Sequence, residues 1–110
     1  MTALSVLQQR AMRVSELYRA QFGIADDPAY YIGKLAEEMG EVTAAHLKVE
    51  GLSRGSDADP ATLSAALEDE LADLLGFLLV YSEKRGVDLT AAFDRKWGRY
   101  LEDTDDPRGD

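Results

Sequence analysis

Five acidic side chains stand at spacings that could build one metal site. Glu37, Glu38 and Glu41 fall on one predicted helix, and at about 100° per residue they share a face. Glu70 and Asp73 stand one turn apart on another predicted helix. Carboxylates that face each other across two helices form the hard oxygen ligand set that Mg²⁺ and Mn²⁺ prefer. For the first three residues a solvated acidic face is the alternative interpretation.

The second pair of acids lies in an apolar segment. Residues 71–81 read LADLLGFLLVY, which is apolar almost all round a helix and is typical of a buried one. An ionised carboxylate in apolar surroundings is costly unless a cation neutralises it. We therefore expect Glu70 and Asp73 to be buried, and to be neutralised either by a Lys or Arg or by a bound metal ion.

The composition argues against other kinds of site. The chain has 110 residues, no cysteine and one histidine. Thiolate metal sites, disulfides and cysteine nucleophiles are therefore excluded, and a Ser-His-Asp triad is disfavoured. A di-iron bundle would need two Glu-x-x-His pairs, whereas His46 lies five residues after Glu41. His46 falls on the apolar stripe of its helix, so we expect it to be partly buried and hydrogen-bonded.

The charge balance bears on partners and location. Acidic residues outnumber basic ones 21 to 12, which gives a net charge of −9. Such a chain repels nucleic acid and anionic membrane surfaces, so neither is an expected partner. The sequence holds no apolar run of about 18 residues, and its first residues do not resemble a secretory signal. We expect a cytoplasmic protein.

Four helices are predicted to position the acidic residues. Alanine and leucine are frequent whereas valine and isoleucine are few, which favours helices over strands. Asp-Pro pairs beginning at Asp27 and Asp59 open two of them, because Asp is a good N-cap and Pro suits the first helical position. The predicted helices cover about 3–22, 28–48, 60–84 and 88–102, with a loop at 51–59, a single domain over 1–102 and an acidic disordered tail at 103–110.

The acidic motif resembles that of the MazG-like all-α nucleotide pyrophosphohydrolases. The pattern is Glu-Glu-x-x-Glu, followed after 28 intervening residues by Glu-x-x-Asp. The flanking segments KLAEEMGEV and ELADLLGFLLVY also look like this family, and the similarity covers about residues 30–100. Phosphoribosyl-ATP pyrophosphatases share much of the same pattern, so the resemblance does not fix the substrate.

The resemblance implies an enzyme with a four-helix, bundle-like MazG-type fold. Its reaction would be the Mg²⁺-dependent cleavage of a nucleoside triphosphate between the α- and β-phosphates, giving a monophosphate and pyrophosphate. Glu38, Glu41, Glu70 and Asp73 would hold the metal, for which Mn²⁺ is an alternative. Glu37 would orient or deprotonate the attacking water, or share a further metal.

Three basic residues are candidates to contact the substrate phosphates: Lys34, Lys96 and Arg99. Family members often carry a Lys, Asn and Arg set on the helix after the second acidic motif. Here the corresponding stretch reads FDRKWGRYL, and the chain contains no asparagine. Solvation at the surface, with packing of the side-chain stems, is the alternative role for Lys96 and Arg99.

The third predicted helix also predicts self-association. A helix that is apolar all round can hardly be covered by three neighbours in a chain of this length, so we expect a homodimer or homotetramer with this helix near its centre. Two other functions stay open. One is phosphoribosyl-ATP hydrolysis. The other is a non-catalytic helical binding or regulatory module, in which Arg or Lys side chains pair with the carboxylates.

Overall fold

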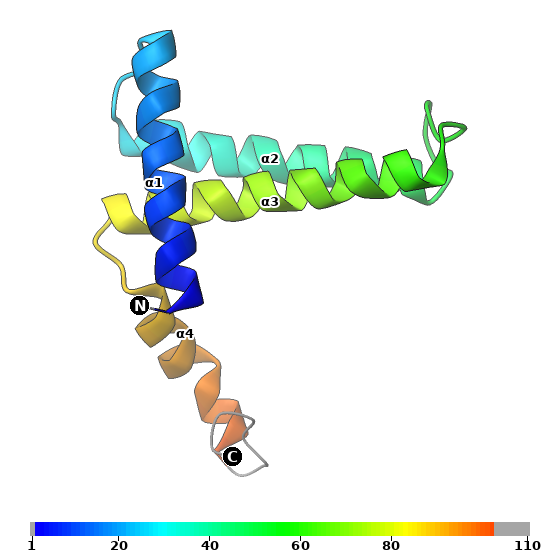
Figure 1. The fold of residues 1–110 in the computed structure, drawn as a ribbon. Coiled ribbons are helices and arrows are strands. Elements are labelled where there is room, and N and C mark those ends of the chain that lie inside the picture. The colour runs from blue at the N-terminus through cyan, green and yellow to red at the C-terminus, as the bar shows by residue number, and fades with distance from the viewer. Residues whose placement is uncertain (1, 103–110) are drawn as a thin grey trace.

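The computed structural model describes residues 2–102, which fold into helices joined by turns and loops (Figure 1). No strand occurs within this range, so the predicted all-α class is confirmed. The first three helices begin and end within one residue of their predicted bounds. The elements are α1 (Ala3–Phe22), α2 (Pro28–Val49), α3 (Pro60–Lys84), α4 (Leu89–Lys96) and a short 3₁₀ helix, η1 (Gly98–Leu101).

The helix ends form through local capping. The Asp27 carboxylate accepts a hydrogen bond from the Ala29 amide at 2.9 Å, and the Asp59 carboxylate accepts one from the Thr62 amide at 3.2 Å. Each such cap stabilises a helix by about 1 kcal/mol. Gly23 ends α1 in the left-handed conformation at φ 65°, which glycine adopts without strain. Short-range signals therefore fix where these helices start and stop.

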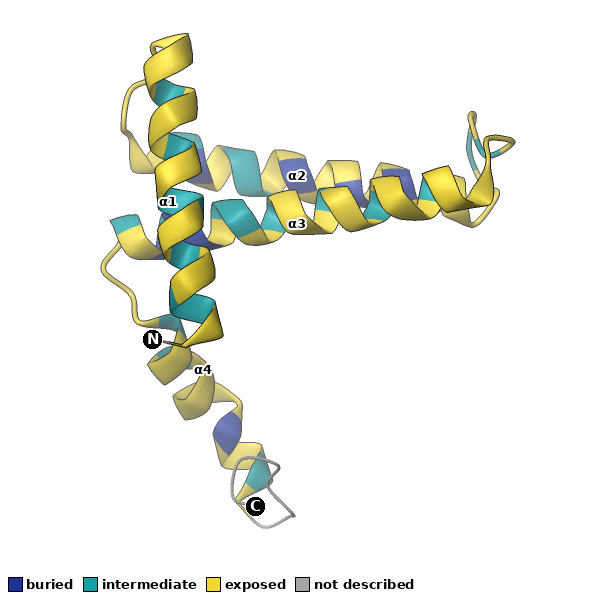
Figure 2. Cartoon of the chain, in the orientation of Figure 1, coloured by how far each residue is buried: buried dark blue, intermediate teal, exposed yellow. Residues whose placement is uncertain are grey.

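Helices α2 and α3 lie side by side and antiparallel, and we call this pair the α2–α3 hairpin (Figure 1). Helix α1 crosses the hairpin near the C-terminal end of α3, where the Gln8 amide donates to the Leu79 carbonyl at 3.1 Å. Among residues 2–102, no helix combines the length and the apolar character needed to cross a membrane. Most positions are exposed (Figure 2), and the buried apolar residues are Tyr31, Val42, Ala45, Leu79 and Val80.

The fourth helix is shorter than predicted. We expected one helix over 88–102, but α4 ends at Lys96 and the chain tightens into η1 from Gly98. Glycine inside a helix costs about 1 kcal/mol relative to alanine, and neither α1 nor the hairpin packs extensively against this segment to offset that cost. The predicted acidic tail at 103–110 lies outside the described residues.

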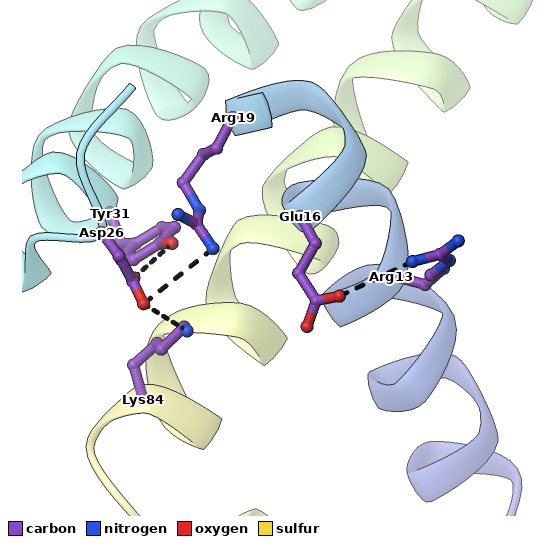
Figure 3. A network of polar contacts seen from close by, with 6 residues as sticks. All are labelled: Arg13, Glu16, Arg19, Asp26, Tyr31 and Lys84. Atoms are coloured by element: carbon purple, nitrogen blue, oxygen red, sulfur yellow. Dashed lines mark hydrogen bonds and ion pairs between the residues drawn. The ribbon is translucent and has the colours of Figure 1, made fainter. Parts of the chain in front are cut away.

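A polar network ties three helices together at the open end of the hairpin (Figure 3). The Asp26 carboxylate, just before α2, accepts hydrogen bonds from Lys84 Nζ at 2.7 Å and from the Tyr31 hydroxyl at 2.8 Å. Arg19 of α1 lies 3.9 Å from the same carboxylate. The hydrogen bond from Lys84, and then that from Tyr31, hold the pKa of Asp26 below its usual value. This network links α1 to the hairpin through Arg19.

Candidate metal centre

Three glutamates meet between the two helices of the hairpin. Glu38 and Glu41 stand one turn apart on α2, and Glu70 projects from α3. Each contributes a carboxylate oxygen to a group whose members lie within 4.8 Å of one another. Oxygens bound to one Mg²⁺ lie about 3–4 Å apart, since each bond is about 2.1 Å long. Small side-chain rotations would therefore bring all three oxygens within reach of one ion.

Two of the three carboxylates carry an oxygen with no hydrogen-bond partner. Glu38 is only 6 % exposed, and its Oε2 is buried and unpartnered. Glu70 is half-buried, and its Oε2 is also buried and unpartnered. Buried polar atoms in proteins are nearly always hydrogen-bonded, so two orphaned oxygens in one cluster call for an explanation. A divalent cation fits them, because it would serve both oxygens at once.

The cluster is electrostatically unfavourable without such a cation. Burial, followed by the charges of Asp73 and Glu41, raises the pKa of Glu38. Burial, followed by the charges of Glu41 and Asp73, raises the pKa of Glu70. Within residues 2–102, the one cation in ion-pair contact with the three glutamates is Lys34, whose Nζ lies 3.9 Å from Glu38. The alternative that a Lys or Arg neutralises the carboxylates is therefore supported only by this one long contact.

The burial of the acidic residues differs from expectation. We expected Asp73 to be buried in the apolar run, but it is exposed. It lies about 60° around α3 from Glu70, whose carboxylate meets those of α2. It acts on Glu38 and Glu70 through its charge and is not one of the three converging carboxylates. The buried acid is Glu38. Its signal in the sequence is its place in the apolar series Tyr31, Glu38, Val42 and Ala45, which repeats at helical spacing.

The other predicted residues lie at different distances from the cluster. Glu37 is exposed on α2, where its carboxylate accepts a hydrogen bond from Lys34 at 3.1 Å. Lys96 and Arg99 lie on α4 and η1, which project away from the hairpin (Figure 1). Arg99 donates to the Tyr100 hydroxyl at 2.9 Å. Within a single chain, Glu37 and Lys34 therefore lie beside the cluster, whereas Lys96 and Arg99 lie away from it.

A cavity of about 210 Å³ adjoins the cluster. Glu41 and Glu70 line it together with Lys48, which follows Glu41 by two helical turns on the same side of α2. We did not predict Lys48 as a site residue, although this seven-residue spacing is visible in the sequence. Pockets that enclose small molecules usually measure about 300–1,000 Å³, so this one can take only part of a nucleotide. The remaining lining residues are Ala44, Ala45, Leu63 and Ala66.

The histidine lies away from the cluster. We expected His46 to be partly buried on an apolar stripe, but it is exposed. The predicted stripe also contains Ile32, Met39 and Val42, and of these only Val42 is buried, whereas Ile32 and Met39 are exposed like His46. The buried face of α2 is therefore turned from the predicted stripe and contains Tyr31, Glu38, Val42 and Ala45.

The site is chemically suited to bind a hard divalent cation next to an anionic ligand. Three carboxylates supply oxygen ligands, and Lys48 supplies a positive charge in the same cavity. Comparison with family models, with well-characterised proteins and with solved structures yields no match. The activity therefore has to be inferred from the chemistry of the cluster and from the resemblance of its motif.

Proposed function

We propose that this chain is a Mg²⁺-dependent nucleoside triphosphate pyrophosphohydrolase. It cleaves the bond between the α- and β-phosphates and releases a nucleoside monophosphate and pyrophosphate. The observation that supports this most directly is the convergence of Glu38, Glu41 and Glu70, two of which carry buried oxygens without partners. The substrate class comes from the resemblance of the acidic motif to the MazG-like family.

The three converging glutamates would hold the metal, and Asp73 would complete the ligand set from the next turn of α3. Bound Mg²⁺ would neutralise phosphate charge and acidify a water molecule. Glu37 stands next to the cluster and is accessible to solvent, and it would orient the attacking water and accept its proton. Lys34 holds the Glu37 carboxylate through its contact at 3.1 Å.

The charge of the protein supports a metal-dependent reaction. A triphosphate that approaches a chain of net charge −9 meets repulsion, and the glutamate cluster strengthens it locally. A dication between the carboxylates and the phosphates turns this repulsion into attraction. Lys48 lies in the same cavity and is placed to contact a phosphate beyond the metal. The other partner in this function is a further copy of the chain, in a homodimer or homotetramer.

The test is a panel of nucleoside triphosphates, together with phosphoribosyl-ATP, incubated with the full chain and Mg²⁺. Pyrophosphate is expected as the product rather than orthophosphate. Glu41→Gln and Asp73→Asn should each lower the rate by at least about 100-fold, since changes even to residues that only hydrogen-bond to metal ligands cost about 10–100-fold. Glu68→Gln is the matched control, because Glu68 is exposed on α3 and outside the cluster.

Full activity in both site variants would contradict the assigned ligands. The absence of turnover on every substrate would contradict the enzyme and favour the binding module. Turnover of phosphoribosyl-ATP alone would keep the reaction and change the substrate.

A further inference from the structure

The cavity beside the three glutamates runs along the α2–α3 hairpin for two helical turns. On α2, its lining residues Glu41 and Lys48 stand seven residues apart, which is a rise of about 10 Å. On α3, Glu70 and Leu63 are separated by the same number of residues. Because the helices are antiparallel and Glu41 meets Glu70, Lys48 lies at the far end of the cavity, level with the first turn of α3. The cavity therefore has carboxylates at one end and an ammonium group at the other.

Small apolar side chains form the middle of the cavity. They are all alanines, which offer no hydrogen-bonding group in their side chains, so a polar ligand is held mainly at the two ends. The volume of about 210 Å³ is smaller than the roughly 300 Å³ at which pockets for whole small molecules begin. The space therefore suits an elongated fragment of a substrate. The three residues are Ala44, Ala45 and Ala66.

The ammonium group of Lys48 is free to bind an anion. Within residues 2–102, no carboxylate lies in ion-pair contact with it, whereas Lys34 and Lys84 are paired with carboxylates at 3.1 and 2.7 Å. Its side chain also lies against the loop between α2 and α3, because a Cβ atom placed on Gly55 would stand 3.5 Å from Lys48 Cε. The loop thus supports the lysine stem, and less side-chain entropy is lost when the ammonium group binds.

We propose that this cavity binds the pyrophosphate end of a nucleoside triphosphate, with the β-phosphate at the glutamate end and the γ-phosphate on Lys48. The inference rests on the proposed function for the identity of the substrate and adds the direction in which it binds. A chain of phosphates is elongated and anionic, so it matches a narrow cavity with cations at both ends, namely the metal ion and Lys48. A nucleoside diphosphate has no third phosphate to reach Lys48. The site therefore selects triphosphates.

This direction places the leaving group opposite the attacking water. Glu37 stands four residues before Glu41 on the same side of α2, and Lys48 stands seven residues after it. The attacking and leaving oxygens of such a displacement lie roughly in line with the phosphorus. The water oxygen bonds to the α-phosphorus and its proton passes to Glu37. The bridging oxygen leaves on the β-phosphate with the electron pair of the broken bond, and Lys48 faces the charge that develops on the pyrophosphate.

The first test is the binding of inorganic pyrophosphate to the full chain in MgCl₂, measured by isothermal titration calorimetry without turnover. The native chain should bind it, and Lys48→Met should bind it at least about ten-fold more weakly, because a hydrogen bond between charged groups is lost. Lys48→Arg should keep most of the affinity, since arginine also binds phosphate. Arg85→Met is the matched control, because Arg85 is exposed at the opposite end of the hairpin. Equal affinities of the native chain and Lys48→Met, or no binding by the native chain, would overturn the inference.

The inference and the proposed function can fail separately. Turnover of triphosphates, together with an unchanged pyrophosphate affinity in Lys48→Met, would leave the reaction and overturn the direction of binding. Pyrophosphate binding that depends on Lys48, without turnover of any triphosphate, would support the pyrophosphate site and contradict the reaction.

The second test fills the middle of the cavity. Ala66→Leu should lower the affinity for pyrophosphate at least about ten-fold, while the affinities for Mn²⁺ and for a nucleoside monophosphate stay those of the native chain. The unchanged Mn²⁺ affinity also shows that the variant is folded. Ala65→Leu is the matched control, because Ala65 is exposed on α3 and does not line the cavity. Weaker binding of the monophosphate with unchanged binding of pyrophosphate would place the nucleoside in the cavity and overturn the inference.

Discussion

Glu38 and Glu70 stand 32 residues apart in the sequence, and the α2–α3 hairpin brings their carboxylate oxygens within 4.8 Å of each other. Each of the two residues has one buried oxygen without a hydrogen-bond partner. Burial and the neighbouring acids raise the pKa of both groups. The fold therefore holds two like charges together at a cost in free energy, which a bound dication would remove.

Divalent cations should stabilise the fold. Mg²⁺ or Mn²⁺ that binds the folded chain alone raises its free energy of unfolding, by about 2.7 kcal/mol at a hundred times Kd. Thermal unfolding with increasing MgCl₂ measures this gain as a rise in Tm. NaCl at equal ionic strength is the control, because general screening acts with either salt. Equal shifts in Mg²⁺ and in NaCl would indicate that no specific site exists.

Glu38→Gln should separate the destabilising effect of the buried charge in the metal-free chain from its contribution to metal binding. Glutamine keeps the shape of the side chain and removes the charge, so the metal-free variant should unfold at a higher temperature than the native chain. The same variant should lose most of the Tm gain in Mg²⁺. Thermal melts with EDTA and with MgCl₂ measure both outcomes. In both conditions, Glu68→Gln should change the free energy of unfolding by no more than about 0.5 kcal/mol, as expected for an exposed position.

The stability of the metal-free chain should fall as the pH rises past the mildly acidic range. The raised pKa values of Glu38 and Glu70 mean that the folded state binds more protons than the unfolded chain. Their stabilising contribution is complete below the pKa of the unfolded chain and is lost as the pH passes the raised pKa of the folded state. Bound Mg²⁺ keeps both carboxylates ionised, so its stabilising effect should grow over the same interval.

The measurement is Tm against pH between about pH 5 and pH 8, in EDTA and in MgCl₂. The two curves should diverge towards higher pH, and in Glu38→Gln they should diverge less. Asp26 acts in the opposite sense, since its lowered pKa gives stability that is present above its ordinary pKa and is lost only in stronger acid. Parallel curves for the native chain would contradict the assignment of the raised pKa values.

Breaking the network at Asp26 should lower the free energy of unfolding (Figure 3). The Asp26 side chain is 42 % exposed, so solvent screening reduces its 2.7 Å contact with Lys84 to about 1 kcal/mol. A double-mutant cycle of Asp26→Asn and Lys84→Met in urea unfolding measures this coupling. The pair Arg13 and Glu16 is the control, because its exposed 3.8 Å contact should couple by less than about 0.5 kcal/mol. Equal coupling energies in the two pairs would show that the contact between Asp26 and Lys84 stabilises the fold no more than an ordinary exposed ion pair does.

The sequence predicts the local structure well because the signals for it are local. The Asp-Pro pairs at Asp27 and Asp59 mark two helix starts within one residue, since a cap needs only its own first turn. The break at Gly98 is harder to place, because the length of α4 depends on whether other elements pack on it.

The burial of single residues was predicted less well, since it depends on which faces meet. Apolar stripes on α2 point both towards α3 and away from it, and the sequence alone favours neither. Asp73, which we expected to be buried, is therefore exposed, and Glu38, for which a solvated face was left open, is buried. The meeting of Glu38, Glu41 and Glu70 was still anticipated, because their spacing on two helices holds whichever of them is buried. Lys48 was missed because its relevance appears only with the cavity.

The most direct test of the metal site is a titration of the metal-free chain with Mn²⁺, in which the EPR signal of the free ion reports binding. We expect saturable binding by the native chain, with an affinity at least about 100-fold lower in Glu38→Gln and in Glu70→Gln. Glu68→Gln should bind as the native chain does. Absence of saturable binding, or native affinity in Glu38→Gln, would contradict the assignment of these carboxylates to a metal.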